Sequence, residues 1–163
     1  MPIHQPHAIA YLLTLPKPDL EAFLSLALRK LDPVLLDTLL GDWQFEELVA
    51  GQTEEVIEGL LGAFEERSQS GAYYKPFFLD AKSFTYVPPE TELWFAEMSR
   101  WLDYGAAQAM SGNKTHAFGI LQRCIRLMDD IANDNIVFAD EPGEWMLCCK
   151  HDFRKIYDEL AAQ

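Results

Sequence analysis

The feature that most constrains this chain is an alternation of large and small residues between Trp101 and Cys124. Gly105 is small enough to let two antiparallel helices approach closely where it faces Ala117 and Cys124. Trp101 and Leu121 are large enough to fill the space at either end of that contact. The pattern therefore predicts a tightly packed helical hairpin in this region.

Apolar residues recur at three- and four-residue spacing along most of the remaining chain, which is typical of helices with one apolar stripe. Asp32 and Thr53 are capping residues between neighbouring segments of this kind. The segments with helical spacing are 20–31, 34–40, 43–49, 56–64, 93–105, 117–131 and 153–160. We therefore predict an all-α, mostly helical domain over residues 1–163, built from antiparallel helical hairpins in an αα-superhelix-like bundle.

Two segments lack the helical spacing. The first, at about 71–89, is a non-helical crossover that carries Tyr73, Tyr74, Phe77, Phe78, Phe84 and Tyr86. These rings either fix the crossover by burial against both helical halves or line a groove for a ligand or partner. The second, at 136–148, contains two short β-prone runs joined by turn residues, which favours a small β-hairpin.

Composition narrows the classes of partner. The chain carries 26 acidic and 13 basic residues, a formal net charge of −13. This balance disfavours nucleic acid and anionic membrane surfaces and permits a basic protein partner.

The apolar stretch from Ala8 to Leu15 is shorter than the roughly 20 residues of a membrane-spanning helix. The three cysteines, two of them adjacent, do not form a disulfide framework, so we expect a cytoplasmic protein.

The hairpin region also resembles a known repeat family. Over residues 101–124 the chain is similar to a tetratricopeptide-type helical hairpin, on the residues Trp101, Tyr104, Gly105, Gly112, Ala117, Leu121 and Cys124. The copy is single and degenerate: Tyr104 stands in place of the usual leucine, and Gln108 in place of a tyrosine. The resemblance implies a superhelical fold whose concave face binds peptides or proteins without catalytic residues.

Acidic and aromatic residues are the candidates for partner contact. From Asp129 to Glu144 the chain has no Lys or Arg, so this run is either a solvated edge or a patch for a basic protein. No residue spacing predicts a metal site or a cofactor. The predicted partner-binding residues are Tyr73, Tyr74, Tyr86, Asp129, Asp130 and Asp134.

These observations favour a non-catalytic protein-binding domain, of the adaptor type or of the immunity type that neutralises a basic partner. The alternative is a small enzyme whose pocket forms where dispersed polar residues converge: His116, His151, Cys148 and Asp134. A pocket that joins two or more of these residues would favour the enzyme, and their dispersal would favour binding. The sequence predicts no particular oligomeric state.

Overall fold

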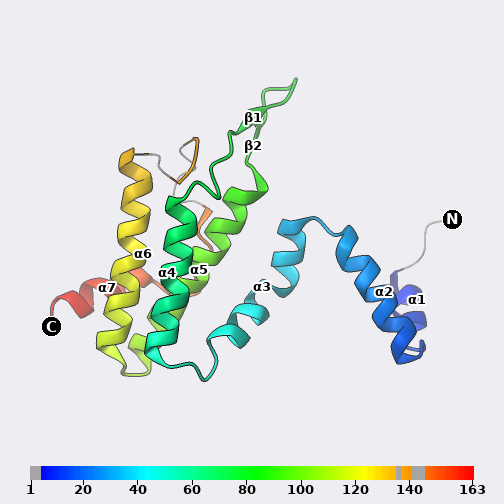
Figure 1. Cartoon of the computed structure of the whole chain (residues 1–163), viewed down its shortest axis with the longest axis horizontal. Helices are drawn as coiled ribbons and strands as arrows, with labels where there is room; N and C mark the ends of the chain where they lie inside the picture. The colour runs from blue at the N-terminus through cyan, green and yellow to red at the C-terminus, as the bar shows by residue number, and fades with distance from the viewer. Residues whose placement is uncertain (1–4, 135–136, 141–145) are drawn as a thin grey trace.

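The protein is all-α, as predicted, in a computed structural model that describes residues 5–134, 137–140 and 146–163, the side chains of 132–134 excepted (Figure 1). The elements in these residues are helices α1 (Gln5–Leu12), α2 (Lys17–Lys30), α3 (Pro33–Val49), α4 (Glu54–Gln69), α5 (Pro89–Met110), α6 (Lys114–Asp134) and α7 (Phe153–Ala161), and strands β1 (Phe78–Leu79) and β2 (Thr85–Tyr86). No helix in these ranges has the length and apolar character needed to cross a membrane.

Helices α5 and α6 form the predicted hairpin and pack against each other. The turn between them uses Gly112, whose φ of 94° lies in the left-handed region that glycine tolerates. At Gly105 the helices approach so closely that a Cβ there would lie 2.8 Å from Leu121 Cγ and 3.3 Å from Ile120 Cγ2. The close approach is confirmed at Gly105, but its nearest neighbours are Ile120 and Leu121 instead of Ala117 and Cys124.

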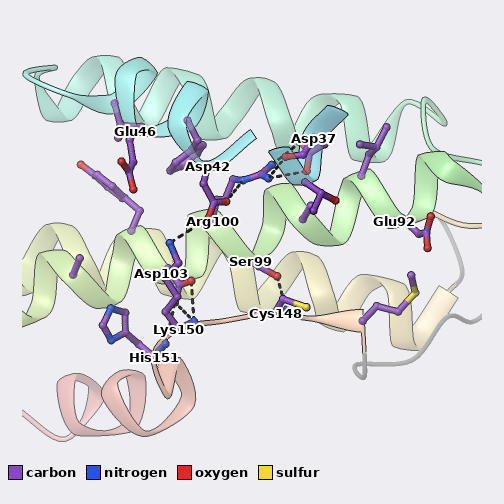
Figure 2. A pocket seen from close by; sticks show the side chains of 18 of the residues that line it. Asp37, Asp42, Glu46, Glu92, Ser99, Arg100, Asp103, Cys148, Lys150 and His151 are labelled. Carbon is purple, nitrogen blue, oxygen red and sulfur yellow. Dashed lines mark hydrogen bonds and ion pairs between the residues drawn. The ribbon is translucent and has the colours of Figure 1, made fainter. Parts of the chain in front are cut away.

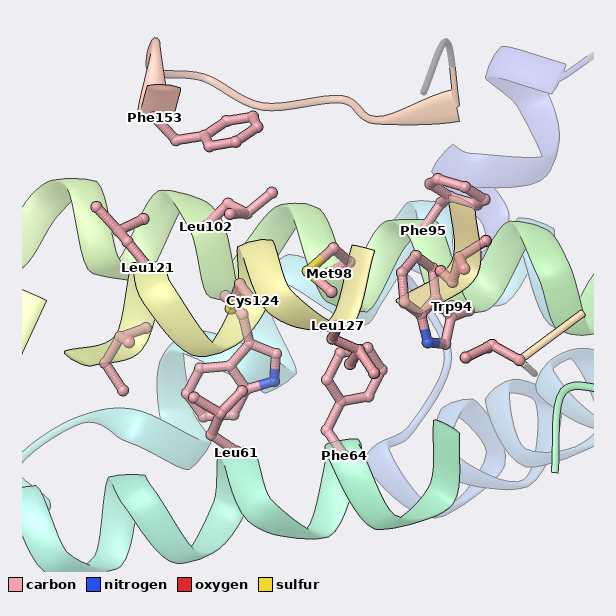
Figure 3. Close-up of a cluster of buried hydrophobic side chains, with 14 of the residues drawn as sticks. Leu61, Phe64, Trp94, Phe95, Met98, Leu102, Leu121, Cys124, Leu127 and Phe153 are labelled. Atoms are coloured by element: carbon pink, nitrogen blue, oxygen red, sulfur yellow. The ribbon is translucent and has the colours of Figure 1, made fainter. Parts of the chain in front are cut away.

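The core lies between α4, α5 and α6 (Figure 3). Trp94 is fully buried, with its ring centroid 5.7 Å from that of Phe64 and 5.2 Å from that of Phe138. Its indole N–H donates a hydrogen bond of 2.8 Å to Ser68 Oγ, so this buried donor is satisfied. Phe153 at the start of α7 covers the opposite side of the α5–α6 pair. Helices α4 to α7 and residues 137–138, which we call the body, contain the buried apolar residues of the described part of the chain.

The aromatic crossover projects from the body as a short hairpin. Strands β1 and β2 pair antiparallel, with Phe78 opposite Tyr86 and their rings stacked at 4.9 Å. Phe78, Phe84 and Tyr86 are 60%, 63% and 46% exposed, whereas Tyr73 is half-buried against Phe64. Tyr73, at the start of the crossover, is thus partly buried against α4, whereas the rings at its tip are exposed.

The β-hairpin predicted at 136–148 falls partly on residue 136 and residues 141–145, which lie outside the described residues. The rest of that segment, 137–140 and 146–148, contains no strand. Val137 and Phe138 are buried in the core instead. Phe138 packs against Trp94 and Phe95 of α5, so the apolar character of this run reflects burial in the core and not the alternation of a strand.

The first two helices form an arm that extends away from the body (Figure 1). Neither α1 nor α2 contains a buried residue, and in α3 only Gly41 is buried. The spacing correctly predicted a helix at α2, but this chain does not bury its apolar stripe. α3 runs unbroken through the two segments predicted at 34–40 and 43–49, and its later residues Phe45 and Val49 contact the core.

Candidate functional site: a groove between α3, α5 and residues 146–151

A groove of about 780 Å³ lies between α3, α5 and the segment 146–151 (Figure 2). Its apolar lining includes Phe45, Val49, Leu93, Ala96 and Met146. Carboxylates from both helices also line it: Asp37, Asp42, Glu46, Glu92 and Asp103. The groove thus combines an apolar surface with an acidic one.

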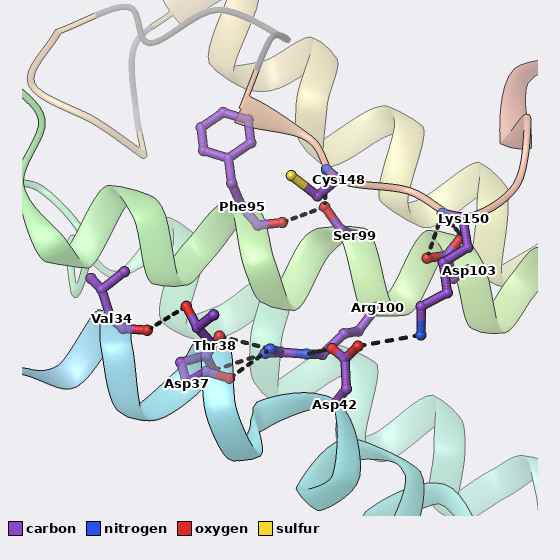
Figure 4. A network of polar contacts seen from close by, with 10 residues as sticks. All are labelled: Val34, Asp37, Thr38, Asp42, Phe95, Ser99, Arg100, Asp103, Cys148 and Lys150. Atoms are coloured by element: carbon purple, nitrogen blue, oxygen red, sulfur yellow. Dashed lines mark hydrogen bonds and ion pairs between the residues drawn. The ribbon is translucent and has the colours of Figure 1, made fainter. Parts of the chain in front are cut away.

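Arg100 ties α5 to α3 (Figure 4). Its guanidinium donates to both carboxylate oxygens of Asp37, at 2.8 and 2.7 Å, and through Nε to Asp42 Oδ1 at 2.8 Å. Burial would lower the pKa of Arg100, but the hydrogen bonds to the two aspartates outweigh it and raise that pKa. Arg100 therefore holds the two walls of the groove together as a permanent cation.

Asp42 is shared between two cations. Besides its bond to Arg100, it pairs with Lys150 Nζ at 3.3 Å. The hydrogen bond from Arg100, followed by the interaction with Lys150, lowers the pKa of Asp42. Because the pKa of Asp42 is lower in the folded protein than in the unfolded one, its ion pairs with Arg100 and Lys150 are complete above the ordinary titration range of an aspartate. They are lost as the pH falls through the pKa that Asp42 has in the folded protein.

Two side chains of α5 fix the segment 146–151 (Figure 4). Ser99 Oγ accepts a hydrogen bond of 2.9 Å from the Cys148 backbone N–H. Asp103 accepts from the backbone N–H groups of Lys150 and His151, at 2.8 and 3.1 Å to Oδ1. These polar side chains therefore position the backbone of the segment 146–151, which forms the third side of the groove.

The groove brings together two of the four residues named for an enzyme pocket. Cys148 and His151 both line it, but no hydrogen bond joins them among the described residues, and Figure 2 shows them on opposite sides of Asp103 and Lys150. His116 lines a separate pocket of about 540 Å³ with Glu54 and Tyr104. The side chain of Asp134 lies outside the described residues. Only two of the four residues therefore meet in one pocket. The nearby carboxylate of Asp103 does not orient the His151 imidazole through any described hydrogen bond, because it accepts the backbone N–H groups of Lys150 and His151.

The neighbouring thiols are protonated at neutral pH. Burial, followed by the charge of Asp103, raises the pKa of the Cys149 thiol to about 11. Burial raises the pKa of the Cys124 thiol as well, and that side chain is fully buried. Because the thiolate is the nucleophile, neither residue is suited to nucleophilic catalysis.

Thiol labelling of the native protein checks the relative reactivity of the three cysteines. At pH 8 a disulfide reagent such as dithionitrobenzoate should react first with Cys148, which is exposed. Cys149 should react about a hundred times more slowly than an ordinary thiol, because so little of it is thiolate. Cys124 should react only after denaturation. Mass spectrometry of the labelled peptides assigns each phase, and fast labelling of Cys149 would contradict the burial described above.

The predicted partner residues come from two different elements, the crossover and α6. Tyr74 and Tyr86 are exposed in the crossover, and Tyr73 is half-buried, with its hydroxyl accepting from Arg67 Nε at 3.4 Å. Asp129 and Asp130 are exposed near the C-terminal end of α6. None of these residues lines the groove.

Apart from Cys148 and His151, which were named for an enzyme pocket, the sequence interpretation missed the groove residues. Their signal is a stripe of polar and small residues at three- and four-residue spacing on the otherwise buried helix α5: Glu92, Ala96, Ser99, Asp103 and Ala107. Such a stripe indicates a helix face that borders a groove. The partners of Arg100 on α3 are about 60 residues away in the sequence, so spacing alone does not indicate them.

Within the described residues, no group of three or more His, Cys, Asp or Glu side chains is arranged to hold a metal ion. Comparisons with protein-family models, with curated proteins and with solved structures find no match to this chain. The geometry of the groove therefore carries the functional argument.

Proposed function

We propose that this chain is a non-catalytic protein-binding domain whose groove between α3 and α5 receives a basic amphipathic helix of a partner protein. The observation that supports the proposal is the groove's combination of an apolar lining with carboxylates. Helices bind in grooves through an apolar face and present polar side chains to the rim. A volume of about 780 Å³ suits the apolar side chains of such a helix.

The charges of the groove favour a cationic partner. Arg100 and Lys150 are both engaged by aspartates of the groove itself. Glu46 and Glu92 are exposed at the groove, and no ion pair with another described residue engages either of them. These two glutamates therefore offer negative charge to lysine or arginine residues of a bound helix.

Two further features support the proposal. The net charge of −13 attracts basic proteins during diffusional encounter. The tetratricopeptide-like resemblance of residues 101–124 implies binding by a helical surface. The three free cysteines fit a reducing compartment, so we place the partner in the cytoplasm, with an adaptor or an immunity-type protein as the role.

Charge reversal tests the groove against the acidic patch at the end of α6. The variant Glu46→Lys/Glu92→Lys should weaken binding of a labelled Leu/Lys amphipathic helical peptide by about tenfold or more, since two attractions become repulsions. Fluorescence anisotropy measures the affinity. The control Asp129→Lys/Asp130→Lys makes the same change in net charge at exposed helix positions outside the groove, and it should retain most of the affinity.

The outcomes separate local recognition from general attraction. Equal losses in the two variants would mean that net charge alone attracts the peptide. A loss confined to Asp129→Lys/Asp130→Lys would move the contact to the end of α6. A peptide with glutamate in place of lysine should not bind the native protein at all, and its binding would contradict a basic partner.

A thiol-dependent enzyme is the second candidate, because Cys148 and His151 share the groove. A working Cys–His pair keeps the thiolate present below neutral pH, whereas an isolated thiol loses it. If the pair acts, alkylation of Cys148 stays fast at pH 6 and slows in His151→Ala. If the groove only binds, the two proteins are alkylated at the same rate and both slow together as the pH falls.

A further inference from the structure

The arm formed by α1, α2 and the turn between them leaves an apolar surface uncovered. Among the described residues of these helices none is buried. Leu13 and Leu26 are 78% and 59% exposed, and Phe23, Leu24 and Leu28 are between 40% and 46% exposed. Leu24 and Leu28, four residues apart, lie on one apolar stripe of α2, and Phe23 lies at the edge of that stripe. An apolar stripe of this kind marks an interaction site.

The surface area of the chain shows how much such an interaction could bury. The protein exposes 10855 Å², whereas a compact monomer of 18.6 kDa exposes about 8,200 Å². The excess of roughly 2,600 Å² is well above the roughly 800 Å² that each partner buries in a standard interface, and it matches what a subunit of an obligate homodimer buries.

The distribution of charge along the chain indicates what binds to the apolar surface of the arm. Residues 1–32 carry three basic and three acidic side chains: Lys17, Arg29, Lys30, Asp19, Glu21 and Asp32. The whole net charge of −13 therefore belongs to the rest of the chain. Two bodies of this charge repel each other, but two arms meet without repulsion. The arm is thus the part of the surface on which a second copy can dock, and it has no excess charge to select a strongly charged partner.

We propose that the protein is a homodimer in which the α1–α2 arm of one chain packs against the α1–α2 arm of a second copy. A two-fold axis brings the same apolar stripe from both copies together, as an isologous interface requires. The arms bury their leucine and phenylalanine side chains, and the acidic bodies point away from each other. The proposal is independent of the groove, because neither α1 nor α2 lines it.

Analytical ultracentrifugation of the full chain tests the proposal. Between about 1 and 100 µM the protein should sediment at twice 18.6 kDa, with dissociation only at the dilute end. Leu24→Glu/Leu28→Glu should be monomeric over the same range. The control Leu79→Glu/Met110→Glu places the same charges at residues that are 67% and 68% exposed outside the arm, and it should remain dimeric.

Hydrogen exchange gives a second readout that needs no substitution. Amides of residues 5–31 should be protected in the concentrated protein and should exchange faster on dilution, while those of α5 and α6 stay unchanged. The arm variant should keep the circular dichroism of the native protein, because α1 and α2 contribute no buried residue to the body. A native protein that is monomeric at 100 µM, or a dimer lost only in the control variant, would overturn the proposal.

Discussion

Trp94→Ala should destabilise the protein by about 4 kcal/mol, which is a large part of the total stability of a domain of this size. Trp94 is fully buried, and its ring contacts Phe64, Phe95 and Phe138 at centroid distances between 4.9 and 5.7 Å. The substitution leaves a cavity that these rings cannot all move to fill, and it removes the hydrogen bond to Ser68. Urea unfolding followed by circular dichroism measures the change.

Trp43→Ala is the matched control. Trp43 lies on α3 and is 58% exposed, so its removal should cost less than about 1 kcal/mol. Both variants and the native protein are compared at one protein concentration, because association changes the apparent stability. Comparable losses at the two positions would show that Trp94 is not the centre of the core described above.

The helices of the body could be predicted from sequence because their buried faces repeat locally. Spacing at three and four residues shows which side of α5 and α6 is apolar, and Asp32 and Thr53 are visible as caps. The same spacing correctly predicted the helix α2, but it does not show what covers the apolar stripe of that helix. An apolar stripe has the same pattern whether a neighbour in the same chain or a second chain buries it.

The groove could not be predicted because it depends on where distant elements meet. Arg100 contacts Asp37 and Asp42 across about 60 residues of sequence, and Asp103 binds backbone groups of the segment 150–151. Polar side chains that serve such contacts look like ordinary solvated residues in the sequence. The predicted candidates Asp129 and Asp130 stood out by local charge density, which does not report on concavity.

Gly105→Val should destabilise the protein by about 3 kcal/mol, and the reason lies in the contact that first defined the hairpin. A Cβ at Gly105 would already lie 2.8 Å from two atoms of Leu121 and 3.3 Å from Ile120 Cγ2. The added valine methyl groups extend further toward α6, so the two helices must separate or Leu121 must leave its rotamer. Either change disrupts the contact between α5 and α6, the most extensive one between two helices of the body.

Gly119→Val is the control on the partner helix. Nothing lies within 4 Å of a Cβ at Gly119, and valine has a slightly better helix propensity than glycine, so stability should change by less than about 0.5 kcal/mol. Thermal and urea unfolding of both variants measure the difference. Because the backbone effect of glycine replacement is common to both, any excess loss at position 105 measures the closeness of α5 to α6. Similar values for the two variants would mean that the hairpin is not packed at Gly105, and the volume pattern between Trp101 and Cys124 would then have no structural basis.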